Sequence, residues 1–225
     1  KVAVFEDGSL KEHISCDKDN FIFTINKILT SFDIRRRFFS SVKKNMGFLV
    51  SDYDFTALDR GMLMPFKNRY DTMETLGLDR LALAASAVKL YPGNNTLIID
   101  AGSCVTYDIV NSSKEYLGGA IAPGLAMRYK AMNSFTDGLP LLQSESFDLW
   151  LGKSTETCIR VGAEKGLVLE IDGMISHYKT EFENLHVLLT GGDAFHLASQ
   201  LKNSIFANQN LVLEGLESIM TINLD

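Results

Sequence analysis

Apolar residues along the chain follow two periods, and together they predict an α/β protein. Alternating or short continuous apolar runs are typical of strands, whereas apolar residues three and four positions apart are typical of helices. Strands are expected within a hairpin at residues 2–14 and at residues 36–42, 96–100, 104–110, 115–121 and 186–190. Helices are expected at residues 21–32, 79–91, 155–182 and from residue 125 onward. Strands that alternate with helices favour a sheet covered by helices.

The helix expected at residues 79–91 has the clearest boundaries. It begins at an aspartate, and the Pro-Gly pair at residues 92 and 93 stops it. One face carries four apolar side chains, namely Leu81, Ala84, Ala85 and Val88. Residues 51–80, just before it, contain mostly loop and turn signals.

The helix expected at residues 155–182 carries an apolar stripe. The stripe consists of Ile159, Ala163, Leu167, Ile171 and Met174. Gly162 and Gly166 would allow a second helix to approach closely. The stripe therefore predicts either dimerisation through this helix or packing into the core of the same subunit.

Two segments of the chain repeat one pattern. Residues 1–15 read as a strand, a polar turn and a return strand, and residues 104–119 read the same way. A duplication would give two similar halves across a cleft, residues 1–95 and residues 96–225, while two unrelated hairpins remain the alternative. The second copy follows an Asp-Ala-Gly-Ser turn, and the numbered chain is expected to begin just after the matching turn, inside a strand.

Composition narrows the function classes. The chain has 225 residues, 46% of them hydrophobic, and a net charge of −6, which gives no general electrostatic footprint for nucleic acid. The basic cluster at residues 35–37 reads as either a solvated charge run or a local patch. No apolar run reaches about 18 residues, so no membrane span is expected. Three cysteines without metal-ligand spacing favour a reducing cytoplasm over a disulfide framework.

The segment "IIDAGSCVTYD", residues 98–108, is the first candidate for chemistry. A glycine turn after a buried strand exposes backbone N–H groups, and the hydroxyls of Ser103 and Thr106 add donors suited to phosphate oxygens. Asp100 is suited to a hard cation such as Mg²⁺. The alternative is an ordinary turn that Asp100 caps.

Three further motifs add weight. "GGAIAPG" at residues 118–124 and "LLTGGDA" at residues 188–194 are glycine turns that let backbone approach a ligand closely. "YDTMETLGLDR" at residues 70–80 ends in an Asp-Arg pair at the mouth of a helix. Arg80 can bind a carboxylate through two hydrogen bonds while Asp79 accepts a proton from a hydroxyl. Alternatively, Asp79 caps the helix and Arg80 is solvated.

Taken in order, these motifs and "LGKSTETCIRVG" at residues 151–162 resemble the type III pantothenate kinases, members of the acetate kinase, sugar kinase, Hsp70 and actin superfamily. The resemblance covers nearly the whole chain. It implies two ribonuclease-H-like halves of an actin-like ATPase fold with an ATP site between them. The implied activity is phosphorylation of pantothenate to 4′-phosphopantothenate, the first step of coenzyme A synthesis.

The resemblance also implies a role for each matching residue. Asp79 is the base that orients or deprotonates the pantothenate hydroxyl, and Arg80 is a ligand of pantothenate. The other substrate residues are Tyr70, Gly77 and Thr155, of which Thr155 reaches the pocket across a homodimer interface.

On the nucleotide side, Asp100 is a candidate ligand for a divalent cation, Mg²⁺ or another, or for a monovalent cation, K⁺ or NH₄⁺. The phosphate and nucleotide residues are Gly102, Ser103, Thr106, Gly118, Gly119, Gly191 and Gly192. Ser103 stands where the family usually has Thr, a change that keeps the hydroxyl.

The resemblance is interrupted at its start. The family opens with a strand ending in Asp-x-Gly-Asn-Thr, and in the numbered chain nothing precedes Lys1. Residues upstream of Lys1 are expected to supply an apolar run and a similar turn. Two rival functions remain open: a non-catalytic relative that binds nucleotide or a partner protein in the same cleft, and a nucleic-acid-binding regulator that uses the cluster at residues 35–37.

Overall fold

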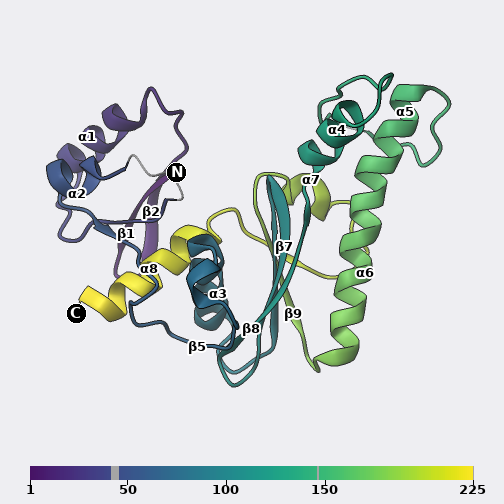
Figure 1. Cartoon of the computed structure of the whole chain (residues 1–225). Helices are drawn as coiled ribbons and strands as arrows, with labels where there is room; N and C mark the ends of the chain where they lie inside the picture. The colour runs from purple at the N-terminus through teal and green to yellow at the C-terminus, as the bar shows by residue number, and fades with distance from the viewer. Residues whose placement is uncertain (42–45, 146, 225) are drawn as a thin grey trace. The chain divides into compact units, whose positions relative to one another are not determined.

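The computed structural model describes residues 1–41, 46–145 and 147–224, which form two compact units (Figure 1). Unit 1 consists of Lys1–Phe66, Asp71–Lys89 and Leu211–Asp225, and unit 2 of Lys67–Tyr70 and Leu90–Asn210. Among the described residues, no helix is long and apolar enough to cross a membrane.

Unit 2 is built on a six-stranded sheet in the order β10-β9-β6-β7-β8-β5. β6, β7 and β8 form an antiparallel meander, and β9 and β10 extend it as parallel strands on the other side of β6. The strands are β5 (Lys67–Asn68), β6 (Thr96–Ala101), β7 (Cys104–Val110), β8 (Glu115–Pro123), β9 (His186–Thr190) and β10 (Phe206–Ala207). Three antiparallel strands followed by two parallel ones form a ribonuclease-H-like sheet, which confirms the predicted α/β class.

The helices of unit 2 include the long one predicted at residues 155–182. It consists of α5 (Thr155–Arg160), a π-helical segment (Val161–Lys165) and α6 (Gly166–Glu181), and α6 runs along the sheet in Figure 1. Its apolar stripe packs into the core: Ile159, Leu167 and Ile171 are buried in one cluster with residues of β6, β7 and β9. Of the two predicted roles, the stripe therefore fulfils core packing. The unit also contains α4 (Leu125–Ser134) and α7 (Ala194–Ala198).

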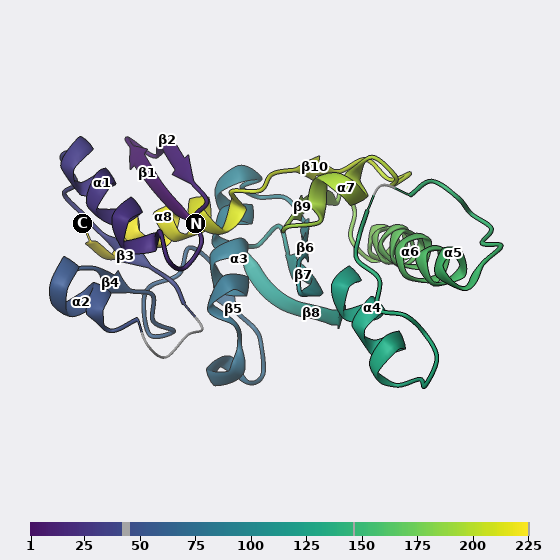
Figure 2. The same cartoon turned by 90° about the horizontal axis from the view of Figure 1, so that it is seen from above.

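Unit 1 has two small sheets instead of one large sheet. β1 and β2 form the predicted antiparallel hairpin, whose turn places Asp7 and Gly8 at φ of 50° and 74°, and β3 pairs with β4 in parallel. The pair β1 and β2 is visible in Figure 2. The elements are β1 (Val2–Glu6), β2 (Ser9–Ile14), α1 (Phe21–Ser31), β3 (Phe38–Phe39), α2 (Phe48–Tyr53), β4 (Thr56–Ala57), the 3₁₀ turn Met73–Thr75, α3 (Leu78–Leu90) and α8 (Leu211–Leu224).

One sequence prediction needs adjustment here, and one agrees with the structure. Of the strand expected at residues 36–42, the structure forms only β3, and residue 42 lies outside the described residues. The loop-rich stretch 51–80 holds only short elements, as its turn signals suggest.

The last helix, α8, packs against α3. A methyl group at Gly215 would overlap the carbonyl oxygen of Ala82, so only glycine permits this approach. Lys89 at the end of α3 also forms an ion pair with Glu217, with 2.6 Å between Nζ and Oε2. The segment that sequence analysis assigned to the second half thus clusters with unit 1, and the division into halves at residue 95 stays a prediction.

Candidate functional site

The turn after β6 is tightly packed. The N–H of Gly102 donates to the carbonyl of Cys104 at 2.9 Å, and the N–H of Gly124 donates to the carbonyl of Ser103 at 3.2 Å. A methyl group at Gly124 would overlap the carbonyl oxygen of Gly102. Glycine is therefore required where the "GGAIAPG" turn meets the "DAGS" turn. Helix α4 begins directly after this turn. Its N-cap residue, Gly124, has no side chain that could accept a hydrogen bond from the first N–H groups of the helix.

The turn after β9 packs against the same place. Gly191 has φ of 100°, and a methyl group there would overlap the backbone of Ala101 and come against the carboxylate of Asp100. The N–H of Asp193 donates to the carbonyl of Ala101 at 3.0 Å. By contrast, nothing lies within 4 Å of the position that a methyl group on Gly192 would take. The structure thus brings the turn at Asp100 and Gly102 next to the turn at Gly191 and Gly192, and their binding of nucleotide stays a prediction.

Two side chains at this turn have unusual surroundings. Thr106 lies opposite Asp100 in the β6–β7 register, and its hydroxyl oxygen is buried without a hydrogen-bond partner in the described part of the chain. Such an unsatisfied buried hydroxyl is a donor suited to an additional polar ligand. Burial raises the pKa of Asp193, and the nearby carboxylate of Glu164 raises it further.

The first two glycines of "GGAIAPG" have other neighbours. Gly118, at φ of 100°, lies against the ring of Tyr70: a methyl group at Gly118 would be 3.2 Å from Cδ2 of that ring. A methyl group at Gly119 would overlap the carbonyl oxygen of Tyr107 on β7. The geometry thus associates Gly118 with Tyr70, a predicted substrate residue, and the nucleotide role of Gly118 and Gly119 stays a prediction.

The Asp-Arg pair lies in unit 1, at the start of α3. Asp79 is exposed in the first helical turn, and its Oδ1 accepts a hydrogen bond of 2.8 Å from the N–H of Arg80. A methyl group at Gly77 would overlap Oδ1 of Asp79. Arg80 is buried, contrary to the alternative in which it is solvated.

Arg60 is a residue that sequence reasoning missed. Its guanidinium donates from Nε and a terminal nitrogen to the carbonyl of Leu76 at 2.9 and 2.8 Å. It therefore fixes the backbone just before Gly77 and Asp79. No local pattern reveals this contact, because the partners are 16 residues apart.

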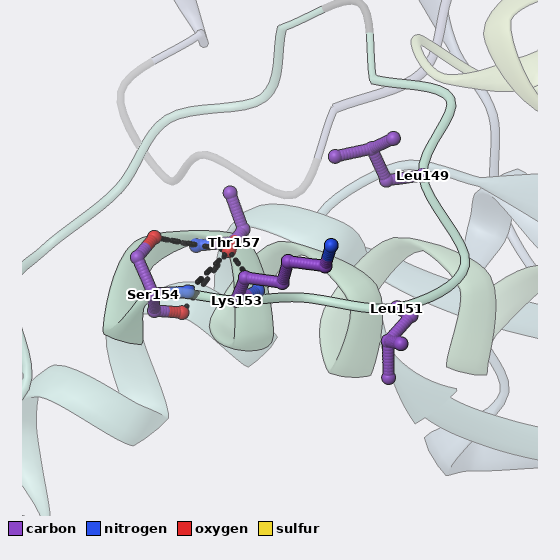
Figure 3. Close-up of a pocket in the computed structure, with 5 residues that line it drawn as sticks. All are labelled: Leu149, Leu151, Lys153, Ser154 and Thr157. Carbon is purple, nitrogen blue, oxygen red and sulfur yellow. Dashed lines mark hydrogen bonds between the residues drawn. The ribbon is translucent and has the colours of Figure 1, made fainter.

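Thr155 is exposed at the first position of α5. The residue before it, Ser154, caps the helix: its hydroxyl accepts from the N–H of Thr157 at 3.3 Å, and Oγ1 of Thr157 accepts from the N–H of Ser154 at 2.9 Å. A pocket of about 320 Å³ adjoins the cap (Figure 3), lined by Leu149, Leu151, Lys153, Ser154 and Thr157. Thr155 is not among the lining residues.

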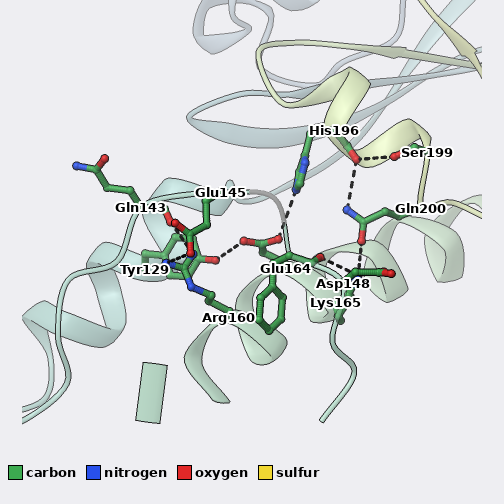
Figure 4. A network of polar contacts seen from close by, with 11 residues as sticks. Tyr129, Gln143, Glu145, Asp148, Arg160, Glu164, Lys165, His196, Ser199 and Gln200 are labelled. Atoms are coloured by element: carbon green, nitrogen blue, oxygen red, sulfur yellow. Dashed lines mark hydrogen bonds and ion pairs between the residues drawn. The ribbon is translucent and has the colours of Figure 1, made fainter. Parts of the chain in front are cut away.

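A polar network that sequence reasoning also missed joins the helices that follow the glycine turns (Figure 4). Glu164, fully buried in the π-helical segment, accepts a hydrogen bond of 2.6 Å from the hydroxyl of Tyr129 on α4. Its other oxygen lies 3.4 Å from Nε2 of His196 on α7. The neighbouring Lys165, also buried, donates to Oε1 of Gln200 at 2.6 Å. The network therefore holds α4 and α7 in fixed positions relative to the long helix.

No group of three or more His, Cys, Asp or Glu side chains suited to a metal ion occurs in the part of the chain that the structure describes. A cation at Asp100 would therefore take most of its ligands from elsewhere, as Mg²⁺ does when it retains water and binds substrate phosphates.

Comparison with known proteins gives consistent results. A family model described as type III pantothenate kinase matches residues 27–177. The type III pantothenate kinase of Christiangramia forsetii is 43% identical over 228 residues, covering 99% of this chain and 94% of the relative. That of Flavobacterium johnsoniae is 40% identical over 237 residues, covering 100% and 94%. Among solved structures, a Baf family protein from Campylobacter jejuni is similar, with a TM-score of 0.60, 25% identity and coverage of 89% and 88%.

Proposed function

The chain belongs to the type III pantothenate kinase family, and we propose that Asp79, Asp100 and the glycine turns beside β6 carry out the reaction of that family. The reaction is the ATP-dependent phosphorylation of pantothenate to 4′-phosphopantothenate, the first step of coenzyme A biosynthesis. The observation that carries the assignment is 43% identity over 99% of the chain to a type III pantothenate kinase.

The packed turns after β6 and β9 are suited to the phosphates of ATP. Phosphoryl transfer passes through a loose transition state, so the protein contributes mainly alignment and neutralisation of charge on the phosphoryl oxygens. The backbone N–H of Gly192 and the hydroxyls of Ser103 and Thr106 supply donors without added negative charge. The unsatisfied hydroxyl of Thr106 supports this role.

Asp100 is the proposed ligand of the divalent cation, Mg²⁺, and of a monovalent cation such as K⁺ or NH₄⁺. A single carboxylate at the end of a strand fits Mg²⁺, which usually takes one or two protein carboxylates together with water and phosphate oxygens. Bound to ATP, the cation neutralises charge on the transferring phosphoryl group. Asp100 would thereby help to orient the phosphates.

Asp79 is the proposed base. As the pantothenate hydroxyl oxygen forms its bond to the γ-phosphorus, the bond from that phosphorus to the oxygen of ADP breaks, and Asp79 accepts the hydroxyl proton. Arg80 binds pantothenate, and Tyr70 and Gly77 line its pocket.

The active enzyme is proposed to be a cytoplasmic homodimer in which Thr155 reaches the substrate of the other subunit. Gly162, Gly166 and Gly173 have no atom within 4 Å of an added methyl group, and Leu169 beside them is exposed. Apolar side chains are also exposed around α5, namely Phe135, Leu141, Leu149, Trp150 and Leu151. A second copy would bury both surfaces. The three free cysteines support a reducing compartment.

Mass spectrometry of the full encoded protein incubated with pantothenate and ATP tests the activity directly. The expected product is 4′-phosphopantothenate, and its yield should require Mg²⁺ and vanish when EDTA is added. Binding of ATP without any product would instead favour a non-catalytic relative.

Sedimentation at micromolar concentration tests the dimer. The wild type should sediment as a dimer, and Leu169→Asp should shift it toward the monomer because the charge would be buried in the interface. A wild-type monomer would contradict the proposal.

A further inference from the structure

β8 contains a bulge beside Tyr116. Its register with β7 pairs Ile109 with Gly118 but Val110 with Tyr116, so Leu117 is an extra residue. Leu117 is 39% exposed, whereas Tyr116 is fully buried. Tyr116 and Gly118, on either side of Leu117, both lie close to the same neighbour, Tyr70.

Tyr116 is anchored by a buried carboxylate that the reaction does not otherwise use. Its hydroxyl donates a hydrogen bond of 2.6 Å to Oδ1 of Asp108, and both residues are fully buried. A hydrogen bond of this length between two buried groups is shielded from competing water. The ring of Tyr116 therefore has little freedom to rotate or shift.

Tyr70 rests on this anchored ring. The centroids of the Tyr70 and Tyr116 rings lie 6.2 Å apart with a tilt of 48°, and Gly118 lies against the edge of the Tyr70 ring. The backbone is fixed as well, because the N–H of Arg69 donates to the carbonyl of Tyr116 and the side chain of Asn68 accepts from the N–H of Tyr70, both at 2.9 Å. Displacement of Tyr116 would consequently move Tyr70.

We propose that the Asp108–Tyr116 hydrogen bond positions the ring of Tyr70 and thereby sets the affinity for pantothenate. Asp108 and Tyr116 are positioning residues, since they act through Tyr70. The inference rests on the proposed function, in which Tyr70 lines the pantothenate pocket.

Tyr116→Phe tests the proposal, with Tyr107→Phe as the matched control. Tyr107 is a buried tyrosine on β7 that also donates to a carboxylate, Oε1 of Glu170 at 2.9 Å. We expect Tyr116→Phe to raise KM for pantothenate about tenfold, the order expected for one strong hydrogen bond, with little change in kcat or in KM for ATP. Tyr107→Phe should leave all three nearly unchanged. An equal rise in KM in both variants, or in neither, would overturn the proposal.

A double-mutant cycle identifies the route of the effect. In the Tyr70→Ala background, which should itself raise KM for pantothenate, Tyr116→Phe should add almost nothing, because its effect passes through the missing ring. Additive effects would overturn the proposal. Asp108→Asn keeps an acceptor of the same shape and should raise KM less than Tyr116→Phe.

A measurement that needs no activity separates this inference from the proposed function. In protein labelled with 3-fluorotyrosine, the ¹⁹F resonance of Tyr70, assigned with Tyr70→Phe, should shift in Asp108→Asn but not in Glu170→Gln. An unshifted resonance would overturn the proposal. A shift together with an unchanged KM in Tyr70→Ala would instead show that Tyr70 lies outside the pantothenate pocket, which would refute the proposal through the proposed function.

Discussion

The strands of the two units are joined differently: those described in unit 2 form one six-stranded sheet, and those described in unit 1 form two separate pairs. In unit 2, β6 pairs antiparallel with β7 on one side and parallel with β9 on the other, and so joins a hairpin and a parallel pair into one sheet. Unit 1 has an antiparallel hairpin, β1–β2, and a parallel pair, β3–β4, but within its described residues they remain separate two-stranded sheets. The comparison shows that a strand paired on both sides unites the sheet and also carries Asp100 to the candidate site.

The largest expected effect is a loss of turnover on substitution of Asp79, the proposed base in unit 1, without a loss of ATP binding at the proposed phosphate site in unit 2. Asp79→Asn should lower kcat by about 10² to 10⁴, the usual contribution of a positioned base, while titration with ATP should give nearly wild-type affinity. Asp71→Asn, at another exposed carboxylate of unit 1, is the control and should retain activity. Near-normal turnover in Asp79→Asn would exclude it as the base.

Truncation of one core side chain in each unit tests the role of β6 in stability. Ile99→Ala should lower the free energy of unfolding by about 2–5 kcal/mol, because Ile99 is fully buried in a strand paired on both sides. Val4→Ala in β1 should cost roughly 1.5 kcal/mol for two methyl groups. Chemical denaturation measures both, and equal losses would contradict the contrast between the sheets.

Two glycines at positive φ sharpen the comparison at the turns. Gly191→Ala should cost roughly 2–3 kcal/mol, because strain at φ of 100° is added to overlap with the backbone of Ala101. It should also weaken ATP binding.

Gly8→Ala in the hairpin of unit 1 should show the smallest effect. Its φ of 74° is unfavourable for alanine, but the nearest atoms, on Glu217 and Lys89, lie 3.7 and 3.9 Å from the added methyl group. About 1 kcal/mol is expected, with unchanged ATP affinity. Thermal unfolding and ATP titration of the two glycine variants would reveal whether crowding, beyond positive φ, distinguishes the turns.

The sequence predicted those features that neighbouring residues decide. The strands at 96–100 and 104–110 and the helix at 79–91 were predicted within one or two residues, because their apolar runs and stop signals are local.

Other features depend on contacts between distant residues. An apolar stripe predicts that a helix face is buried, but it does not reveal the surface that this face packs against. The sequence therefore left open whether Leu167 and Ile171 pack within the subunit or against a second copy. Glu164 and Lys165 are buried, and hydrogen bonds to partners 35 residues away, Tyr129 and Gln200, offset part of the free-energy cost of removing them from water. The bulge at Leu117 likewise follows from pairing with β7, and the single-strand pattern of β8 does not reveal it.

The return of α8 to α3 has a consequence for synthesis on the ribosome. The residues of unit 2 from 90 to 210 are contiguous, so this unit can fold as soon as it has emerged. The backbone of α3 at Ala82 and the side chain of Lys89 gain their contacts with α8 only after the residues of α8 have emerged. At typical elongation rates this delay is on the order of ten seconds, during which α3 lacks these contacts.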